Sequence, residues 1–105
     1  MLQSTSLFTH LEPEASEETF VTLFEKAGVK IESIASHGQA SPEDFWYDQP
    51  GDEWVMIMRG EAVLEVQDQE PLSMHPGDHV MIPRHVRHRV ARTTPDTLWL
   101  AVHVP

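Results

Sequence analysis

Apolar residues follow two different spacings along the chain, and the change falls near Gly28. Before this point, four apolar side chains recur at the three- and four-residue spacing of one helix face: Phe20, Leu23, Phe24 and Ala27. Ser16 is placed to cap the first turn, and Gly28 follows as a natural end. The pattern therefore predicts a short N-terminal α-helix over residues 16–27.

From Val29 onward the apolar residues come in short alternating runs separated by turn residues. The polar, glycine- or proline-containing interruptions fall at 59–61, 67–70, 76–78 and 94–96. Several short strands at spacings of about 8 to 12 residues are typical of a β-sandwich or barrel. The chain shows no internal repeat and no low-complexity tract that would mark a second domain. We therefore expect one domain, with a lead-in and helix over 1–28 and a barrel over 29–105.

The run 53–58 is apolar on both faces. Val55 and Ile57 share one side with Glu53, while a tryptophan and two methionines take the other. A strand of this kind needs cover on both sides. The barrel interior is one cover, and the helix over 16–27 or a second subunit is the other. We therefore expect a homodimer.

The net charge and the absence of cysteine argue against several classes of function. The chain has 105 residues, with 7 basic and 17 acidic side chains and a formal charge of −10. That balance argues against binding nucleic acid or an anionic membrane through net charge. With no cysteine, a disulfide, a thiolate nucleophile and a cysteine-based zinc site are excluded. The N-terminal residues lack the pattern of a signal peptide, and no apolar run approaches the roughly 20 residues of a membrane span, so we expect a cytoplasmic protein.

Two spacings in the barrel region belong together. Glu53 is followed after six residues by Gly60, and Gly77 is followed after five by Pro83, with His88 five positions further on. This pair of spacings resembles the two motifs of the small single-domain bacterial cupins. The second motif also has a structural reason, because a glycine suits its tight turn and a proline ends a strand cleanly.

The resemblance covers roughly residues 29–105 and implies an all-β fold, the cupin jelly-roll β-barrel, usually dimeric. It also implies a small-molecule ligand and a divalent metal ion such as Mn, Fe, Ni or Zn, with no organic cofactor. The usual metal ligands of the family are two histidines and a glutamate from the first motif and a histidine from the second. Glu53 and His88 match two of these positions, while Tyr47 and Gln49 stand where the two first-motif histidines are usual.

Gln49 decides how this departure is interpreted. Its amide oxygen is a harder donor than imidazole and would favour Mn or Fe(II). Alternatively, Tyr47 and Gln49 line a polar pocket that recognises a ligand. With the family's looser spacing the two positions fall instead on Trp46 and Asp48, and Asp48 should point away from Gln49 if this segment is extended.

His85 is a candidate replacement ligand, because with Glu53 and His88 it would make a set of two histidines and one carboxylate. The alternative is a turn residue at a position where the family usually has glycine, since histidine tolerates the left-handed conformation better than most residues. His103 shares a strand face with Trp99, and we interpret it as a core or interface histidine; alternation does not tell which face of that strand points inward.

Four arginines are the other candidate cluster: Arg84, Arg87, Arg89 and Arg92. Arg92 shares a face with His88 on a regular strand, and an inward arginine would hold a carboxylate or phosphate with two hydrogen bonds. Arg87 and Arg89 should point outward and pair with acids such as Glu61 or Glu65.

These residues support an enzyme hypothesis. A divalent ion at Glu53 and His88, assisted by Gln49, would polarise an oxygen of a small anionic metabolite, with Arg92 as anchor and Tyr47 as proton relay. Isomerisation, decarboxylation and oxygen insertion all remain open. The alternative is a non-catalytic metabolite-binding or structural cupin with a degenerate metal site.

Overall fold

The computed structural model describes residues 1–8 and 17–105, which form eight β-strands and no helix. The strands are β1 (Thr19–Lys26), β2 (Val29–Ser36), β3 (Asp52–Arg59), β4 (Ala62–Val66), β5 (Leu72–Met74), β6 (His79–Ile82), β7 (His88–Thr93) and β8 (Thr97–Val104). The all-β prediction is thus confirmed for the described part of the chain. No helix in these residues is long and apolar enough to cross a membrane; the cytoplasmic location stays a prediction.

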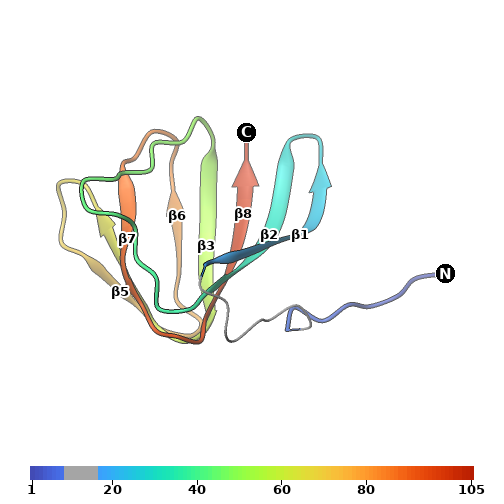
Figure 1. Cartoon of the computed structure of the whole chain (residues 1–105). Helices are drawn as coiled ribbons and strands as arrows, with labels where there is room; N and C mark the ends of the chain where they lie inside the picture. The colour runs from blue at the N-terminus through green and yellow to red at the C-terminus, as the bar shows by residue number, and fades with distance from the viewer. Residues whose placement is uncertain (9–16) are drawn as a thin grey trace.

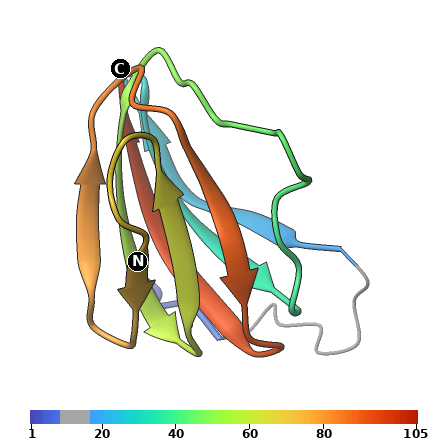
Figure 2. The same cartoon turned by 90° about the vertical axis from the view of Figure 1, so that its left-hand side faces the viewer.

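The strands form two antiparallel sheets packed face to face (Figures 1 and 2). The larger sheet has the order β1-β2-β8-β3-β6, and the smaller has the order β5-β4-β7. The strands that neighbour each other in these sheets are mostly distant in sequence, and all the pairings are antiparallel. β1 is an edge strand that pairs with β2 alone among the described strands, so its other edge lies on the side of the sandwich that these strands leave open.

The predicted helix over 16–27 is wrong, because β1 occupies most of that segment and pairs with β2. β1 is rich in threonine, phenylalanine and valine, whose side chains favour strands. A β-bulge between Thr22 and Phe24 inserts Leu23 as an extra residue. The bulge interrupts the alternation of the strand and so produces the apparent helical spacing. Ser16, the predicted cap, lies outside the described residues.

The core lies between the inner faces of the two sheets. On β3 the predicted alternation is confirmed: Glu53, Val55 and Ile57 are buried, and the residues between them are half-buried on the outer face. Ile57 is fully buried and packs with Trp99 of β8 and Leu64 of β4 in one apolar cluster. Burying a side chain of this size stabilises the fold by roughly 1.5–3 kcal/mol.

The outer face of the larger sheet stays partly exposed in the single chain. Trp54 and Met56 of β3 are half-buried there, and Met81 of β6 is 49% exposed. Met81 lies directly across from Trp54 in the sheet. The homodimer that would cover this face stays a prediction.

The segment between β2 and β3 runs along the open side of the sandwich next to β7 (Figure 2). Tyr47 in this segment makes an isolated antiparallel bridge with His88. Arg89 fixes the segment as well, because its guanidinium donates to the Ser41 carbonyl at 2.9 Å and to the Glu65 carboxylate at 2.7 Å. The expected outward pairing of Arg89 with an acid is thus confirmed, and the segment forms one wall of the space inside the fold.

Gly60→Ala should destabilise the protein more than Gly77→Ala. Both glycines have positive φ, of 79° and 90°, and an alanine in that conformation costs about 1–2 kcal/mol. At Gly60 the added Cβ would also lie 2.7 Å from the Cα of Thr97, whereas at Gly77 it would meet nothing within 4 Å. Urea denaturation of both variants measures the difference, and equal losses of stability would show that the contact with Thr97 costs nothing.

Candidate functional site

A pocket of about 120 Å³ opens between the larger sheet, β7 and the segment that carries Tyr47. Its apolar and aromatic walls come from both sheets, and its polar groups are mainly carboxylates and imidazoles. The lining residues are Glu18, Phe20, Glu32, Ile34, Tyr47, Gln49, Glu53, Val55, Leu64, Ile82, His88, Val90, Trp99 and His103.

Glu53 and His88 meet in this pocket from opposite sheets. Glu53 is an inward residue at the start of β3 and is 8% exposed; His88 begins β7 and is 4% exposed. The Nε2 atom of His88 lies 3.6 Å from Oε1 of Glu53. The two cupin-motif positions that match in sequence are therefore brought together in space.

A backbone carbonyl orients the ring of His88. Nδ1 lies 2.9 Å from the carbonyl oxygen of Val86, which only accepts, so Nδ1 carries a proton and Nε2 faces Glu53. Burial of the ring opposes its charged form, but the Glu53 carboxylate and the Val86 carbonyl outweigh this and raise the pKa of His88. Glu53 thus favours the protonated ring.

His103 and Glu32 extend the cluster on the other side of Glu53. His103 of β8 lies directly opposite Glu53 in the sheet, with its Nε2 atom 3.6 Å from Oε2 of Glu53. The same nitrogen is 2.8 Å from Oε1 of Glu32, a buried residue of β2. Lys30 lies 3.5 Å from the second oxygen of Glu32. Two imidazoles and two carboxylates therefore alternate across the pocket.

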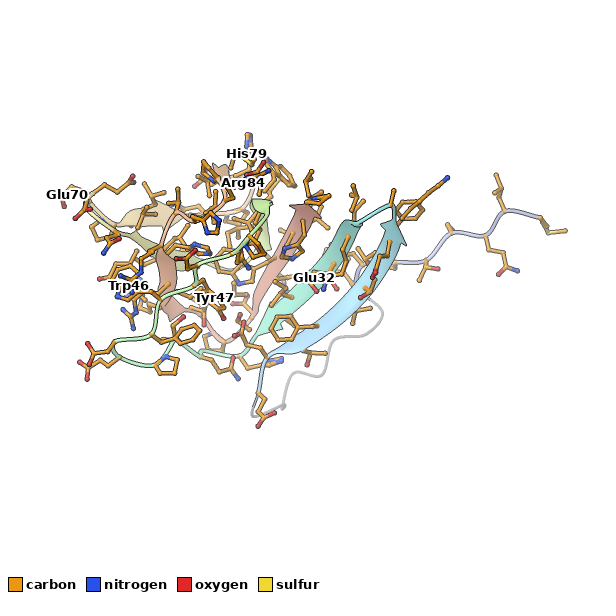
Figure 3. The ribbon with its side chains drawn as sticks, turned by 90° about the horizontal axis from the view of Figure 1, so that it is seen from above. Glu32, Trp46, Tyr47, Glu70, His79 and Arg84 are labelled. Atoms are coloured by element: carbon orange, nitrogen blue, oxygen red, sulfur yellow. The ribbon has the colours of Figure 1, made fainter. Side chains whose placement is uncertain are left out.

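Tyr47 and Gln49 both line the pocket, as predicted for the positions where the family usually has histidine. The phenol ring of Tyr47 stacks on the imidazole of His88, with centroids 5.4 Å apart and planes at 26°. Burial, then the charges of Glu18 and Glu53, raise the pKa of Tyr47. A phenol in this environment stays protonated and acts as a donor. Figure 3 shows Tyr47 on the segment beside β7 and Glu32 on β2.

His85 is not brought into the pocket. It has a φ of 62°, in the left-handed region, as expected for a turn residue at a glycine position. Its Nδ1 atom lies 2.8 Å from Oδ1 of Asp48, and both side chains are at least half exposed. Asp48 points outward while Gln49 faces the pocket, as alternation predicts. The structure therefore does not place His85 beside Glu53 and His88.

Arg92 is also outside the pocket. The pairing of β7 with β4 slips by one residue between Val90 and Arg92, so that Ala91 forms a β-bulge. The bulge separates Arg92 from the inward face that His88 begins, and the side chain is exposed. Arg87, by contrast, is outside as predicted, but its guanidinium lies 5.8 Å from the ring centroid of Trp46, and within the described residues it makes no ion pair with an acid. The arginine anchor inferred for an anionic substrate is therefore absent from this pocket.

Three ionisable pocket residues are additional to those predicted from the sequence: Glu18, Glu32 and His103. Glu18 directly precedes β1, a segment that was predicted as a helix, and Glu32 lies on β2, whose alternation was missed. His103 was interpreted as a core or interface histidine, and the signal that bears on its role is its pairing with Glu53 across β3 and β8. That pairing depends on strand register, which a single sequence does not reveal.

The donor types in the pocket suit a divalent metal ion. Two imidazoles and a carboxylate are the ligand set of many Fe(II), Mn and Zn sites. The Nδ1 contact of His88 with the Val86 carbonyl is the kind of outer hydrogen bond that orients a metal-binding histidine. Among residues 1–8 and 17–105, no group of three or more histidine, aspartate or glutamate side chains is already arranged to hold an ion. Ion binding at His103 would displace Glu32, because the same nitrogen serves both.

Comparison with known proteins agrees with this architecture. The sequence profile described as the cupin domain matches residues 32–103. A crystal structure from Ralstonia eutropha JMP134, of a proposed mannose-6-phosphate isomerase, is 48% identical in sequence with a TM-score of 0.93, and the match covers 97% of each chain. No curated protein matches the sequence.

More distant structures show the same fold. A cupin superfamily protein from Desulfitobacterium hafniense DCB-2 has 22% identity and a TM-score of 0.76, over 90% of this chain and 83% of that one. An RmlC-like cupin protein from Desulfovibrio desulfuricans has 18% identity and a TM-score of 0.79, over 100% and 98% of the two chains. At these identities the similarity concerns the fold alone.

Proposed function

The chain belongs to the cupin domain family, and from that premise we propose that it is an enzyme acting on a small metabolite in the pocket around Glu53. The observation that carries the proposal is the meeting of Glu53, His88 and His103 from three strands in one pocket. Paired carboxylates and imidazoles of this kind serve proton transfer and metal binding alike. Isomerisation is the reaction class that we favour, because the Ralstonia relative of 48% identity is a proposed isomerase.

A divalent ion is the cofactor that we propose, held by Glu53, His88 and His103. When bound, it would polarise an oxygen of the substrate. Tyr47, whose raised pKa keeps the phenol protonated, would donate a proton to that oxygen. Gln49 lines the same pocket and can orient a substrate hydroxyl through its amide.

Binding without turnover is the second candidate function. The observation that favours it is that the pocket's polar groups already contact one another: His103 bonds to Glu32 and the ring of His88 stacks on Tyr47. Such a network satisfies buried polar groups without an ion. In that case the pocket would recognise a metabolite through the same side chains.

Elemental analysis of the protein purified without a histidine tag tests the metal centre. We expect about one equivalent of Mn, Fe, Ni or Zn per chain, as for a mononuclear site. Glu53→Ala and His88→Ala should each abolish binding, because each removes one of three ligands. His85→Ala is the matched control, since this histidine lies outside the pocket and should leave the metal content unchanged.

Two results would contradict the metal centre. One is a folded wild-type protein that takes up none of these ions when each is added in turn. The other is an equal loss of metal in His85→Ala. Either result would favour the metal-free binding pocket.

A further inference from the structure

The charges that line the pocket are predominantly negative. Three carboxylates line it, from Glu18, Glu32 and Glu53, and no lysine or arginine is among its described lining residues. The divalent ion proposed above would offset two of these three negative charges, and no lysine or arginine side chain among the described lining residues would then receive a phosphate or carboxylate group. The pocket is better suited to a ligand that brings positive charge.

The three carboxylates differ in how they are neutralised. Glu32 contacts the ring of His103 and the ammonium group of Lys30, and Glu53 lies between two imidazoles. Glu18 accepts a hydrogen bond from the Ser36 hydroxyl at 2.8 Å, and a hydroxyl carries no charge. Within the described residues, Glu18 is thus the pocket carboxylate without a cationic partner.

Two aromatic side chains line the same pocket as Glu18. Phe20 lies two residues beyond Glu18 on β1, lines the pocket and is 57% exposed. Tyr47 lines the pocket from the segment beside β7, and the charges of Glu18 and Glu53 both act on its phenol. A carboxylate with aromatic faces beside it is the usual environment of an organic ammonium group in proteins.

We propose that Glu18, Phe20 and Tyr47 form a subsite for the ammonium group of a small organic cation. Glu18 would supply the counter-charge, and the rings of Phe20 and Tyr47, which line the same pocket, would lie beside the cation. The subsite rests on the proposed function, since the cation would be the metabolite on which the same pocket acts. It also implies that this chain would not take a phosphorylated sugar, the compound class named for its Ralstonia relative.

Titration calorimetry on chelator-treated protein tests the subsite with three probes. Choline carries a quaternary ammonium, 3,3-dimethyl-1-butanol is its neutral isostere, and mannose 6-phosphate is an anion. We expect choline to bind at least about tenfold more tightly than its isostere, and mannose 6-phosphate not to bind. Equal binding of choline and the isostere, tighter binding of the anion, or no binding of choline would each overturn the subsite.

Glu18→Gln should weaken choline binding about tenfold and leave the isostere unaffected, because only the charge is removed. Glu70→Gln removes the same charge from an exposed turn, far from Glu32 in Figure 3, and should change neither affinity. Thermal melts verify that the variants fold. Should Glu18→Gln not fold, Phe20→Leu gives an independent measurement, with weaker choline binding expected. Unchanged affinity in the folded variants would overturn the proposal.

The outcomes separate this subsite from the proposed metal centre. If the metal centre is absent, choline binding still depends on Glu18, because the probe is titrated without metal. If the subsite is absent, ion binding still depends on Glu53 and His88. The two proposals therefore fail on different measurements.

Discussion

His103→Leu is expected to lower the free energy of unfolding of the metal-free protein by about 2–3 kcal/mol. The ring of His103 bonds to Glu32 at 2.8 Å and faces Glu53 at 3.6 Å, and both carboxylate side chains are no more than 10% exposed. Leucine fills similar space but leaves Glu32 without that bond. Lys30, which contacts the other oxygen of Glu32, is 39% exposed and compensates only in part.

His75→Leu is the matched control, because His75 also pairs with a carboxylate. That pair, with Asp78, lies on the surface, with both side chains more than half exposed and 3.4 Å between the atoms. Exposed pairs of this kind contribute about 0–1 kcal/mol. Urea denaturation of both variants after chelation makes the comparison. Similar small losses would show that the His103 contacts contribute nothing beyond those of a surface pair.

Much of the strand arrangement could be predicted from local pattern, since alternation and turn residues are local properties. The inward face of β3 is an example, because Glu53, Val55 and Ile57 alternate with outward side chains. β1 shows where this reasoning fails. Its bulge at Leu23 gives the strand a helix-like spacing, and the pairing with β2 overrides that local signal.

The same distinction explains the candidate site. Glu53 and His88 were found because motif spacing places them at matching positions of one fold, and the structure brings them together. Arg92 was placed wrongly because a bulge at Ala91 breaks the alternation of β7. The role of His103 could not be inferred, because it depends on the register between β8 and β3. Bulges and register are set by contacts between distant strands, which one sequence does not display.

These corrections also change the chemistry that the pocket supports. Arg92 lies outside the pocket, whereas Glu18 and Glu32 line it. The described lining therefore does not include the arginine expected from the sequence and includes two carboxylates that were not expected. An anionic metabolite was a reasonable inference from the sequence. The three pocket carboxylates are the basis on which we propose a cationic one instead. The difference comes from the bulge in β7, the misassigned segment around β1 and the missed alternation of β2.

Trp99→Ala is expected to have the largest effect on stability, with a loss of about 3–5 kcal/mol. Trp99 is 4% exposed, packs in the core cluster and also lines the pocket. Its indole N–H donates to Ser36, whose hydroxyl donates in turn to Glu18. Alanine would therefore leave a cavity and remove the support of a pocket carboxylate. A domain of this size has a stability of about 5–15 kcal/mol, so the variant should be close to unfolding.

Two further variants separate packing from hydrogen bonding at this position. Trp99→Phe keeps most of the ring and should cost about 1 kcal/mol for the lost N–H donor. Trp46→Ala removes a tryptophan that is only half-buried and lies beneath the guanidinium of Arg87. This variant should also lower the free energy of unfolding by about 1 kcal/mol. Urea denaturation followed by circular dichroism avoids the change in tryptophan fluorescence. If Trp99→Ala were no more destabilising than Trp46→Ala, the packing of Trp99 in the core cluster and its hydrogen bonds through Ser36 to Glu18 would not contribute to the stability of the fold.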